Sequence, residues 1–291
     1  MNGTVVQVFV NGVSLTSVYA LVAVGITMVF GHTRLVNFAH GQVLVLSAYV
    51  AMELGGGVGL LPFLGALLVA MATGGVVSLA MERGLFRFTL NRPVNGFLIS
   101  MGLVILLQNA IQSIWGSGPR GIEPVWKDVF DVGGAQVSAQ RLTVVVLAAV
   151  LIIALYLLLS RSWTGLAVRA TSVDREALAL MGAPVTRIIT GTFVVGGVLA
   201  GAAGALVASI STVTPFYGLE IIVKGFTIAL VGGLGNITGS LVVAVVFGLG
   251  EAAAQTAGLG AWVDALVFGV LIVMMLVRPM GLFRGVEAGV D

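Results

Sequence analysis

Long apolar runs separated by short polar loops fill the 291 residues of the chain. No run alternates strictly between apolar and polar positions, as the strands of a transmembrane β-barrel do, so the spans must be α-helices. A shorter run lies at 41–54, and a long run at 222–250 is interrupted in its middle. We predict an all-α, polytopic membrane bundle of about eight apolar segments. The other runs have the spanning length of roughly 17 to 25 residues and lie at 5–30, 60–81, 94–115, 142–159, 188–210 and 261–277.

The interruption of the long run extends from Leu230 to Ser240 and reads LVGGLGNITGS. Glycines at this density, followed by an asparagine, favour a break in the helix. Irregular backbone at membrane depth persists only where protein buries it or where it lines a water-filled cavity. We therefore expect a broken or re-entrant helix here, near the middle of the membrane.

A second polar interruption, HTRLVNFAHG, lies between His32 and Gly41. Both interruptions combine an asparagine, a glycine and the start of an apolar helix, which indicates an inverted repeat. Paired broken helices in corresponding halves mark the translocation path of many transporters. The alternative is that both are structural kinks capped by asparagine, with both histidines hydrogen-bonded for structure. The residues expected to line a substrate pathway are Asn37, His40, Gly41, Gly232, Gly233, Gly235 and Asn236.

Charged residues make up only 9% of the chain, against about 25% in soluble domains. Arginines concentrate in the loops 82–93 and 160–187 and at Arg278 and Arg284, and basic loops stay on the cytoplasmic side of a membrane. The loop 116–140 carries nearly balanced charge, is too short for a separate domain and is expected outside. The span 188–210 then leads out of the cytoplasm and the span 261–277 leads back into it, so the segment 211–258 between them must begin and end outside. A hairpin at the glycine-rich interruption permits this. We treat residues 1–291 as one transmembrane domain with a cytoplasmic C-terminus.

The loop 160–187 is the most charged stretch, yet apolar residues recur in it at helical spacing. We predict a short amphipathic helix on the inner membrane face, placed where a cytoplasmic partner can bind and move it. The alternative is a solvated connector. The apolar positions are Leu166, Ala170, Val173, Ala177 and Leu180.

Several further positions indicate packing or anchoring. Lys224 is expected to be a snorkelling anchor near the outer end of its segment. Acidic residues fall near segment ends, whereas ion-driven carriers keep carboxylates at mid-membrane. This distribution disfavours a transporter that is powered by an ion gradient. These acidic residues are Glu53, Glu82, Glu220, Glu251 and Asp264. The glycines expected to form a close helix-packing face are Gly191, Gly196, Gly197, Gly201 and Gly204.

Missing motifs exclude several classes of function. The chain has no cysteine and two histidines, which leaves little for thiolate or metal chemistry, and we expect no metal and no cofactor. It lacks the phosphate loop G-x-x-x-x-G-K-[ST] and the H-E-x-x-H and G-x-S-x-G motifs of hydrolases. Its 14 basic residues form no patch for nucleic acid. We therefore expect no enzyme, and any ATP used must bind to a partner chain.

The chain contains, in this order, Asn11-Gly12 with Tyr19-Ala20-Leu21, Gly25 to Gly31 (GITMVFG), Val36 to Gly41 (VNFAHG), Arg169-Ala170 with Asp174, Ala177 and Gly182, Lys224-Gly225-Phe226 with Gly232 to Asn236 (GGLGN), and Arg278 to Phe283 (RPMGLF). Together these stretches resemble the permease subunit of branched-chain amino-acid ABC importers of the LivH type. The resemblance covers essentially the whole chain, and the stretches are specific jointly, although each is weak alone. Gly225 is a minor departure, because the family pattern has alanine there.

The resemblance implies a subunit that moves branched-chain or other neutral amino acids inward across the bacterial inner membrane. Its implied partners are a second homologous permease in a heterodimer, two cytoplasmic ATPase subunits, an external substrate-binding protein and membrane lipid. Urea, short amides or another small polar solute are alternative substrates, and a passive channel or membrane-anchored scaffold is an alternative function. The coupling helix, which docks on an ATPase, is implied at Arg169, Ala170, Asp174, Ala177 and Gly182.

Overall fold

The computed structural model describes the chain except for residues 1, 55–58, 91, 133, 279–280 and 284–291, so Arg284 lies outside the described residues. The described part is almost entirely helical, which confirms the all-α prediction. Its strands, β1 (Val129–Val132) and β2 (Ala135–Ser138), form one antiparallel hairpin. Short 3-10 helices are η1 (Phe86–Thr89) and η2 (Gly260–Trp262). The α-helices are α1 (Asn2–Thr33), α2 (Ala39–Leu54), α3 (Leu60–Gly84), α4 (Pro93–Trp115), α5 (Ala139–Arg161), α6 (Trp163–Val173), α7 (Arg175–Leu180), α8 (Val185–Ala208), α9 (Tyr217–Gly232), α10 (Ile237–Thr256) and α11 (Val263–Val277).

Seven helical segments of the described chain are long and apolar enough to cross a membrane. They comprise α1, α3, α4, α5, α8, α10, and η2 together with α11. The run expected at 41–54 forms α2, and the interrupted run at 222–250 divides into α9 and α10. α2 and α9 have 16 residues each, which is short of a full crossing. The chain is a multi-pass membrane protein.

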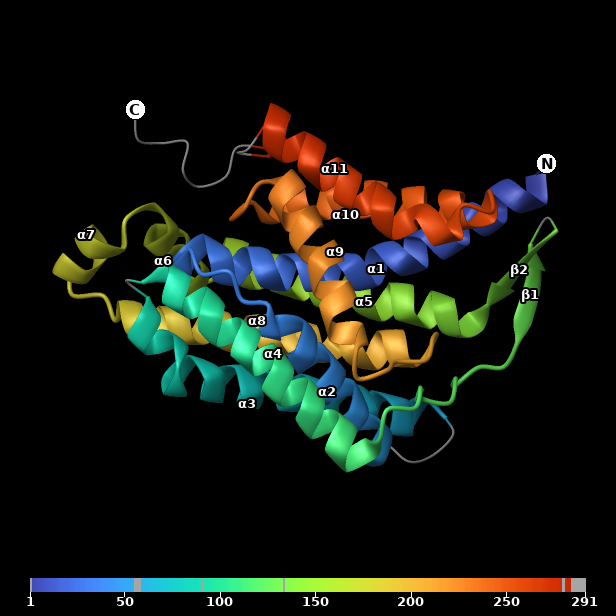
Figure 1. The fold of residues 1–291 in the computed structure, drawn as a ribbon, viewed down its shortest axis with the longest axis horizontal. Helices are drawn as coiled ribbons and strands as arrows, with labels where there is room; N and C mark the ends of the chain where they lie inside the picture. The colour runs from blue at the N-terminus through green and yellow to red at the C-terminus, as the bar shows by residue number, and fades with distance from the viewer. Residues whose placement is uncertain (1, 55–58, 91, 133, 279–280, 284–291) are drawn as a thin grey trace.

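The long helices run between two ends of the molecule (Figure 1). One end carries α6 and α7, and the other carries the β1–β2 hairpin and the start of α1; we call them the α6–α7 end and the β-hairpin end. α1 begins at the β-hairpin end, where the backbone N–H of Gln136 donates to Oε1 of Gln7 over 3.0 Å. It ends at the α6–α7 end, where His32 contacts α6.

Glycines allow the central helices to pack backbone against backbone. α1 packs against α8, α9 and α10, and a Cβ atom at Gly25 would lie 2.8 Å from Nε2 of His40 and 3.3 Å from the carbonyl oxygen of Gly196. Between α3 and α8, a Cβ atom at Gly74 or Gly197 would overlap the opposite backbone. The predicted glycine face of α8 is confirmed at Gly196, Gly197, Gly201 and Gly204, whereas a Cβ at Gly191 would meet nothing within 4 Å.

Two short helices begin inside the bundle instead of at its ends. After α1, residues 34–38 return along that helix, so that His40, the second residue of α2, lies beside Gly25, eight residues before the end of α1. After α8, residues 209–216 precede α9, and Gly218 lies against the start of α2. α1 and α8 run in opposite directions (Figure 1), so each long helix and its short successor have the arrangement that an inverted repeat predicts. The counterpart of the break at 34–38 is thus 209–216 and not the glycine-rich turn.

α9 and α10 form a helical hairpin joined by the glycine-rich turn. Gly233 and Gly235 have φ angles of 98° and 88°, the left-handed region that favours glycine. Oδ1 of Asn236 accepts a hydrogen bond from the N–H of Gly239 over 2.9 Å and caps α10. The break is confirmed, but its expected depth near mid-membrane is wrong. The turn lies beside Gly31, two residues before the end of α1, because α9 continues past the middle of the bundle before it ends.

The charged loop after α5 contains two helices where one amphipathic helix was predicted. Asp174 divides them, since its Oδ1 accepts hydrogen bonds from the N–H groups of Glu176 and Ala177, each over 2.9 Å. A side chain that satisfies the free N–H groups of a first turn starts a new helix. α7 is therefore set off from α6 and extends beyond the bundle (Figure 1).

Candidate functional site

The residues 174–182, which we call the α7 surface, are the exposed tip of the α6–α7 end. Leu180 and Met181 expose 90% and 83% of their surface. Ala177 and Gly182 are also exposed, and Gly182 ends the tip with a φ of 83°. Three of the predicted coupling residues, Asp174, Ala177 and Gly182, lie on the α7 surface.

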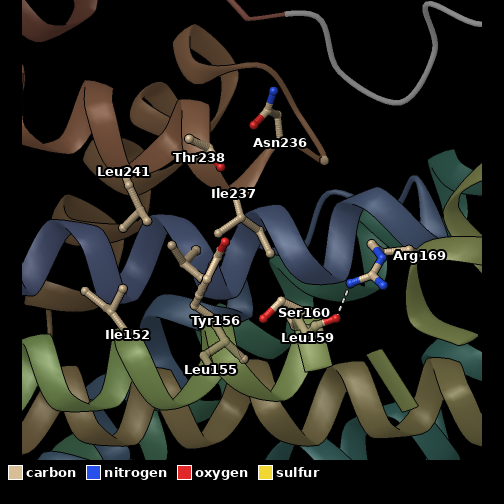
Figure 2. A pocket seen from close by; sticks show the side chains of 12 residues that line it. Ile152, Leu155, Tyr156, Leu159, Ser160, Arg169, Asn236, Ile237, Thr238 and Leu241 are labelled. Atoms are coloured by element: carbon tan, nitrogen blue, oxygen red, sulfur yellow. Dashed lines mark hydrogen bonds between the residues drawn. The ribbon is translucent and has the colours of Figure 1, made fainter. Parts of the chain in front are cut away.

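The other two predicted coupling residues lie on α6, nearer the bundle. The guanidinium of Arg169 donates to the carbonyl oxygen of Leu159 near the end of α5 (Figure 2). Ala170 is half-buried. The structure therefore separates the predicted set into three residues at the exposed tip and two at the base that joins α6 to the membrane helices.

His32 connects the end of α1 to α6. Its Nδ1 lies 2.5 Å from the carbonyl oxygen of Met28, and its Nε2 lies 2.8 Å from the carbonyl oxygen of Val168 and 2.9 Å from Oγ of Ser172. His32 is hydrogen-bonded, as the structural alternative predicted, but its link to α6 was not foreseen. The sequence signal for a contact was the position of His32 in the last turn of a long helix. The partner Ser172 lies 140 residues away in the sequence.

Asn37, His40 and Gly41 surround the start of α2. Oδ1 of Asn37 accepts a hydrogen bond from the N–H of Ala39 over 3.0 Å. His40 is buried, and its Nε2 has no hydrogen-bond partner among the described residues. Asn37 and His40 line a small cavity together with Phe226 of α9, while Gly41 packs on the backbone of α9.

Gly235 and Asn236 line a different cavity, of about 410 Å³, between α1, α5, α6 and α10 (Figure 2). Its wall is mostly apolar, and its further polar and charged groups come from Tyr156, Ser160, Arg169 and Thr238. Gly232 instead packs against Ser240. The structure thus places Asn37 and His40 at one cavity and Gly235 and Asn236 at another, and the two cavities share no lining residue. Gly41, Gly232 and Gly233 line neither of them.

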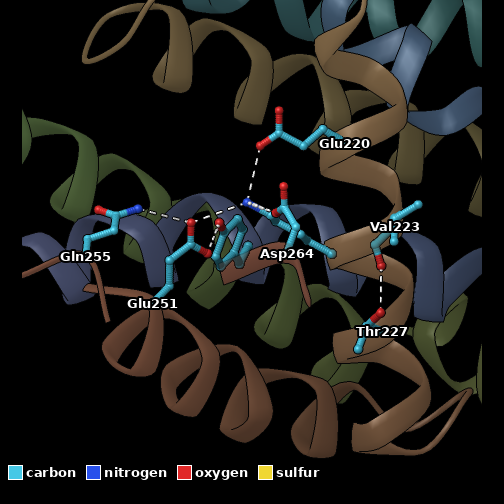
Figure 3. A network of polar contacts seen from close by, with 8 residues as sticks. Glu220, Val223, Thr227, Glu251, Gln255 and Asp264 are labelled. Atoms are coloured by element: carbon cyan, nitrogen blue, oxygen red, sulfur yellow. Dashed lines mark hydrogen bonds and ion pairs between the residues drawn. The ribbon is translucent and has the colours of Figure 1, made fainter. Parts of the chain in front are cut away.

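Lys224 is the centre of an ion cluster that the sequence did not predict. Figure 3 shows the three carboxylates of this cluster, Glu220, Glu251 and Asp264. Its Nζ lies 3.2 Å from Oε1 of Glu220, 3.3 Å from Oε1 of Glu251 and 3.3 Å from Oδ1 of Asp264. The hydroxyl of Tyr19 in α1 donates to Oε2 of Glu251 over 2.6 Å. Lys224 is only 7% exposed, so the snorkelling prediction is wrong. Its ammonium is buried beside the carboxylate of Glu251 from α10, and the more exposed carboxylates of Glu220 and Asp264 also contact it.

The fold defines a multi-pass helical membrane protein with an exposed helical tip at its α6–α7 end. Residues 8–276 match the family described as the permease component of branched-chain amino acid transport systems, and the chain belongs to that family. It is 30% identical to the high-affinity branched-chain amino acid permease LivH of Escherichia coli K12 and 31% identical to BraD of Pseudomonas aeruginosa, with 95% of this chain and 94% of each relative covered. A solved inward-facing structure, described as an ABC transporter of metal-chelate type, is similar with a TM-score of 0.47 and 20% identity, over 92% of this chain and 85% of its own.

Proposed function

We propose that this protein is the permease subunit of an ABC importer that moves branched-chain or other neutral amino acids into the cell. The observation that carries the proposal is the family match over residues 8–276, which spans the helices α1 to α11 almost completely. The partners are a second homologous permease, two cytoplasmic ATPases and an external substrate-binding protein. The membrane is the bacterial inner membrane, with the α6–α7 end and the C-terminus in the cytoplasm.

Uptake into vesicles tests this proposal. Vesicles that hold the permease pair and the ATPases should accumulate labelled leucine only when ATP and the binding protein are both supplied. Omitting the ATPases should abolish uptake. Equal entry of leucine without ATPases would establish a passive channel instead, and urea or acetamide that competes with leucine would indicate the alternative class of substrate.

The coupling role belongs to the α7 surface. A short helix docks into a cleft of a partner by fit of shape, so Ala177→Arg should leave the permease in the membrane but remove most ATP-dependent uptake. Binding of the ATPases to purified permease should fall with it. The matched control is Ala257→Arg, the same change at an exposed alanine near the end of α10. Normal uptake by Ala177→Arg would contradict this assignment.

Asn37 and Asn236 are proposed to contribute polar groups to the substrate path, because a zwitterionic amino acid needs neutral partners that release it again. Both side chains also cap helices, and removing such a cap costs about 1 kcal/mol. Serine separates the two roles, because its hydroxyl can accept the capping hydrogen bond but it lacks the amide group that is proposed to contact the substrate. We expect Asn37→Ser with Asn236→Ser to fold normally and to transport at least tenfold less, a loss of about 1.4 kcal/mol or more. Unchanged transport would assign both residues to capping alone.

A further inference from the structure

An open cavity of about 730 Å³ lies between α3 and α8, outside the two cavities of the proposed pathway. Arg83 and Arg87 line it from the α3 side, and Arg187 lines it from the first turn of α8. Deeper along the same helices its wall becomes apolar, with Leu79, Val194 and Val195. The cavity is therefore cationic at the α6–α7 end and apolar towards the interior of the membrane span.

Glycine makes room for this cavity. α3 and α8 pack backbone against backbone around Gly74 and Gly197, and they leave space beyond that contact. Gly191 faces the cavity, and a Cβ atom there would meet nothing within 4 Å. Gly191 is thus the member of the α8 glycine series that serves no helix contact.

The positive charge of the cavity is only partly compensated. Glu82 is fully buried, and its carboxylate accepts hydrogen bonds from Nε and Nη2 of Arg87, each over 3.2 Å, and from Oγ1 of Thr190 over 2.9 Å. This pair fixes Arg87 at the wall. Arg83 and Arg187 are exposed and have no acidic partner in the described part of the chain. The cavity therefore presents an excess of two positive charges from Arg83 and Arg187.

We infer that this cavity, lined by Arg83, Arg87, Arg187 and the apolar wall at Leu79 and Val194, binds one anionic phospholipid, with its phosphate at the arginines and an acyl chain along the wall. Basic pockets between membrane helices on the cytoplasmic side suit anionic headgroups, and arginine forks match phosphate oxygens. A soluble phosphate would leave the apolar wall empty. From Arg187 to Val195 the helix rises roughly 12 Å, which places the wall at acyl-chain depth. The site is independent of the solute carried.

Native mass spectrometry of the assembled transporter tests this inference. Transporter taken from nanodiscs of phosphatidylcholine with phosphatidylglycerol should retain phosphatidylglycerol selectively. Each arginine near an anionic lipid contributes about 1 kcal/mol, so Arg83→Gln with Arg187→Gln should weaken retention about thirtyfold. Arg161→Gln is the matched control: it removes an exposed arginine at the same end but outside the cavity, and it should retain the lipid normally.

A second variant keeps the test valid if the double variant does not assemble. Gly191→Leu fills the cavity without a change of charge and should also reduce retention of phosphatidylglycerol. Several outcomes would overturn the site: normal retention by Gly191→Leu, an equal loss in Arg161→Gln, or displacement of the lipid by glycerol phosphate without chains. Loss of ATPase binding with normal lipid retention in Arg83→Gln and Arg187→Gln would likewise overturn it and assign these arginines to the ATPase.

Discussion

At the scale of single residues, the burial of Lys224 has an energetic consequence. Its side chain and that of Glu251 are 9% and 8% exposed, whereas Glu220 and Asp264 are half-exposed or more and can be solvated. Removing one partner of a buried ion pair leaves an uncompensated charge, which costs more than the pair itself contributes. The pair between Lys224 and Glu251 is therefore the part of the cluster most sensitive to substitution.

Lys224→Met should destabilise the permease by about 3–5 kcal/mol, because Glu251 would keep its charge without a counter-ion. Lys224→Met combined with Glu251→Leu should recover most of that loss. Thermal unfolding of the purified permease in detergent measures both. Lys127→Met is the control, since Lys127 is exposed in the loop before β1. Equal stability of Lys224→Met and the wild type would contradict the role of the pair.

The sequence predicts residues whose role is local and misses those whose partners are distant. Asn236 could be identified at a helix break, because its cap acts three residues along the chain. Lys224 resembled an anchor, since Glu251 follows 27 residues later on another helix and the pairing depends on how α9 and α10 pack. The separation of Asn37 and Asn236 into two cavities depends in the same way on where each break lies in depth, which glycine content does not encode.

At the scale of elements, α6 packs against three membrane helices, α1, α5 and α8. His32 is the side chain that holds α6 to the last turn of α1 through Val168 and Ser172. Periodicity predicted a helix in this loop, but the division at Asp174 follows from a side-chain cap. The two resulting helices are placed differently, because α7 is exposed at the tip while α6 packs against the membrane helices.

We predict that His32→Leu uncouples transport without loss of the partner. The α7 surface stays intact, so the ATPases should bind and hydrolyse ATP, while uptake per ATP hydrolysed should fall several-fold because α6 is no longer held to α1. Ser172→Ala, which removes one of the contacts of His32, should show a smaller decrease. The ratio of uptake to hydrolysis in vesicles measures this. A wild-type ratio in His32→Leu would exclude the link as a transmission point.

At the scale of the whole molecule, the basic residues predict a single orientation. The α6–α7 end carries Arg83, Arg161 and Arg187, and the β-hairpin end carries the loop 116–140 with its nearly balanced charges. The positive end of a membrane protein stays in the cytoplasm. This argument from charge also required 211–258 to begin and end on one side, and the α9–α10 hairpin satisfies that requirement.

Single cysteines test the orientation in this cysteine-free chain. In intact cells, an impermeant maleimide should label Ser117→Cys and Thr4→Cys, both exposed at the β-hairpin end. Met181→Cys on the α7 surface should react only after permeabilisation. Uptake by each variant is the control for a native fold. The reverse labelling pattern would show that the topology is the opposite one, with the α7 surface outside the cell.

The contact between α1 and α10 has a consequence for how the cell makes this protein. Thr27 and Ser240 share a hydrogen bond across 213 residues of sequence, and Tyr19 reaches Glu251 across 232. At a synthesis rate of about 5–20 residues per second, α1 waits in the membrane for roughly 10 to 40 s before α10 leaves the ribosome. During that interval the side chains of Tyr19 and Thr27 are open to lipid or to an insertion chaperone. A chain that stops after α9 never receives α10, and we expect the membrane proteases to degrade it.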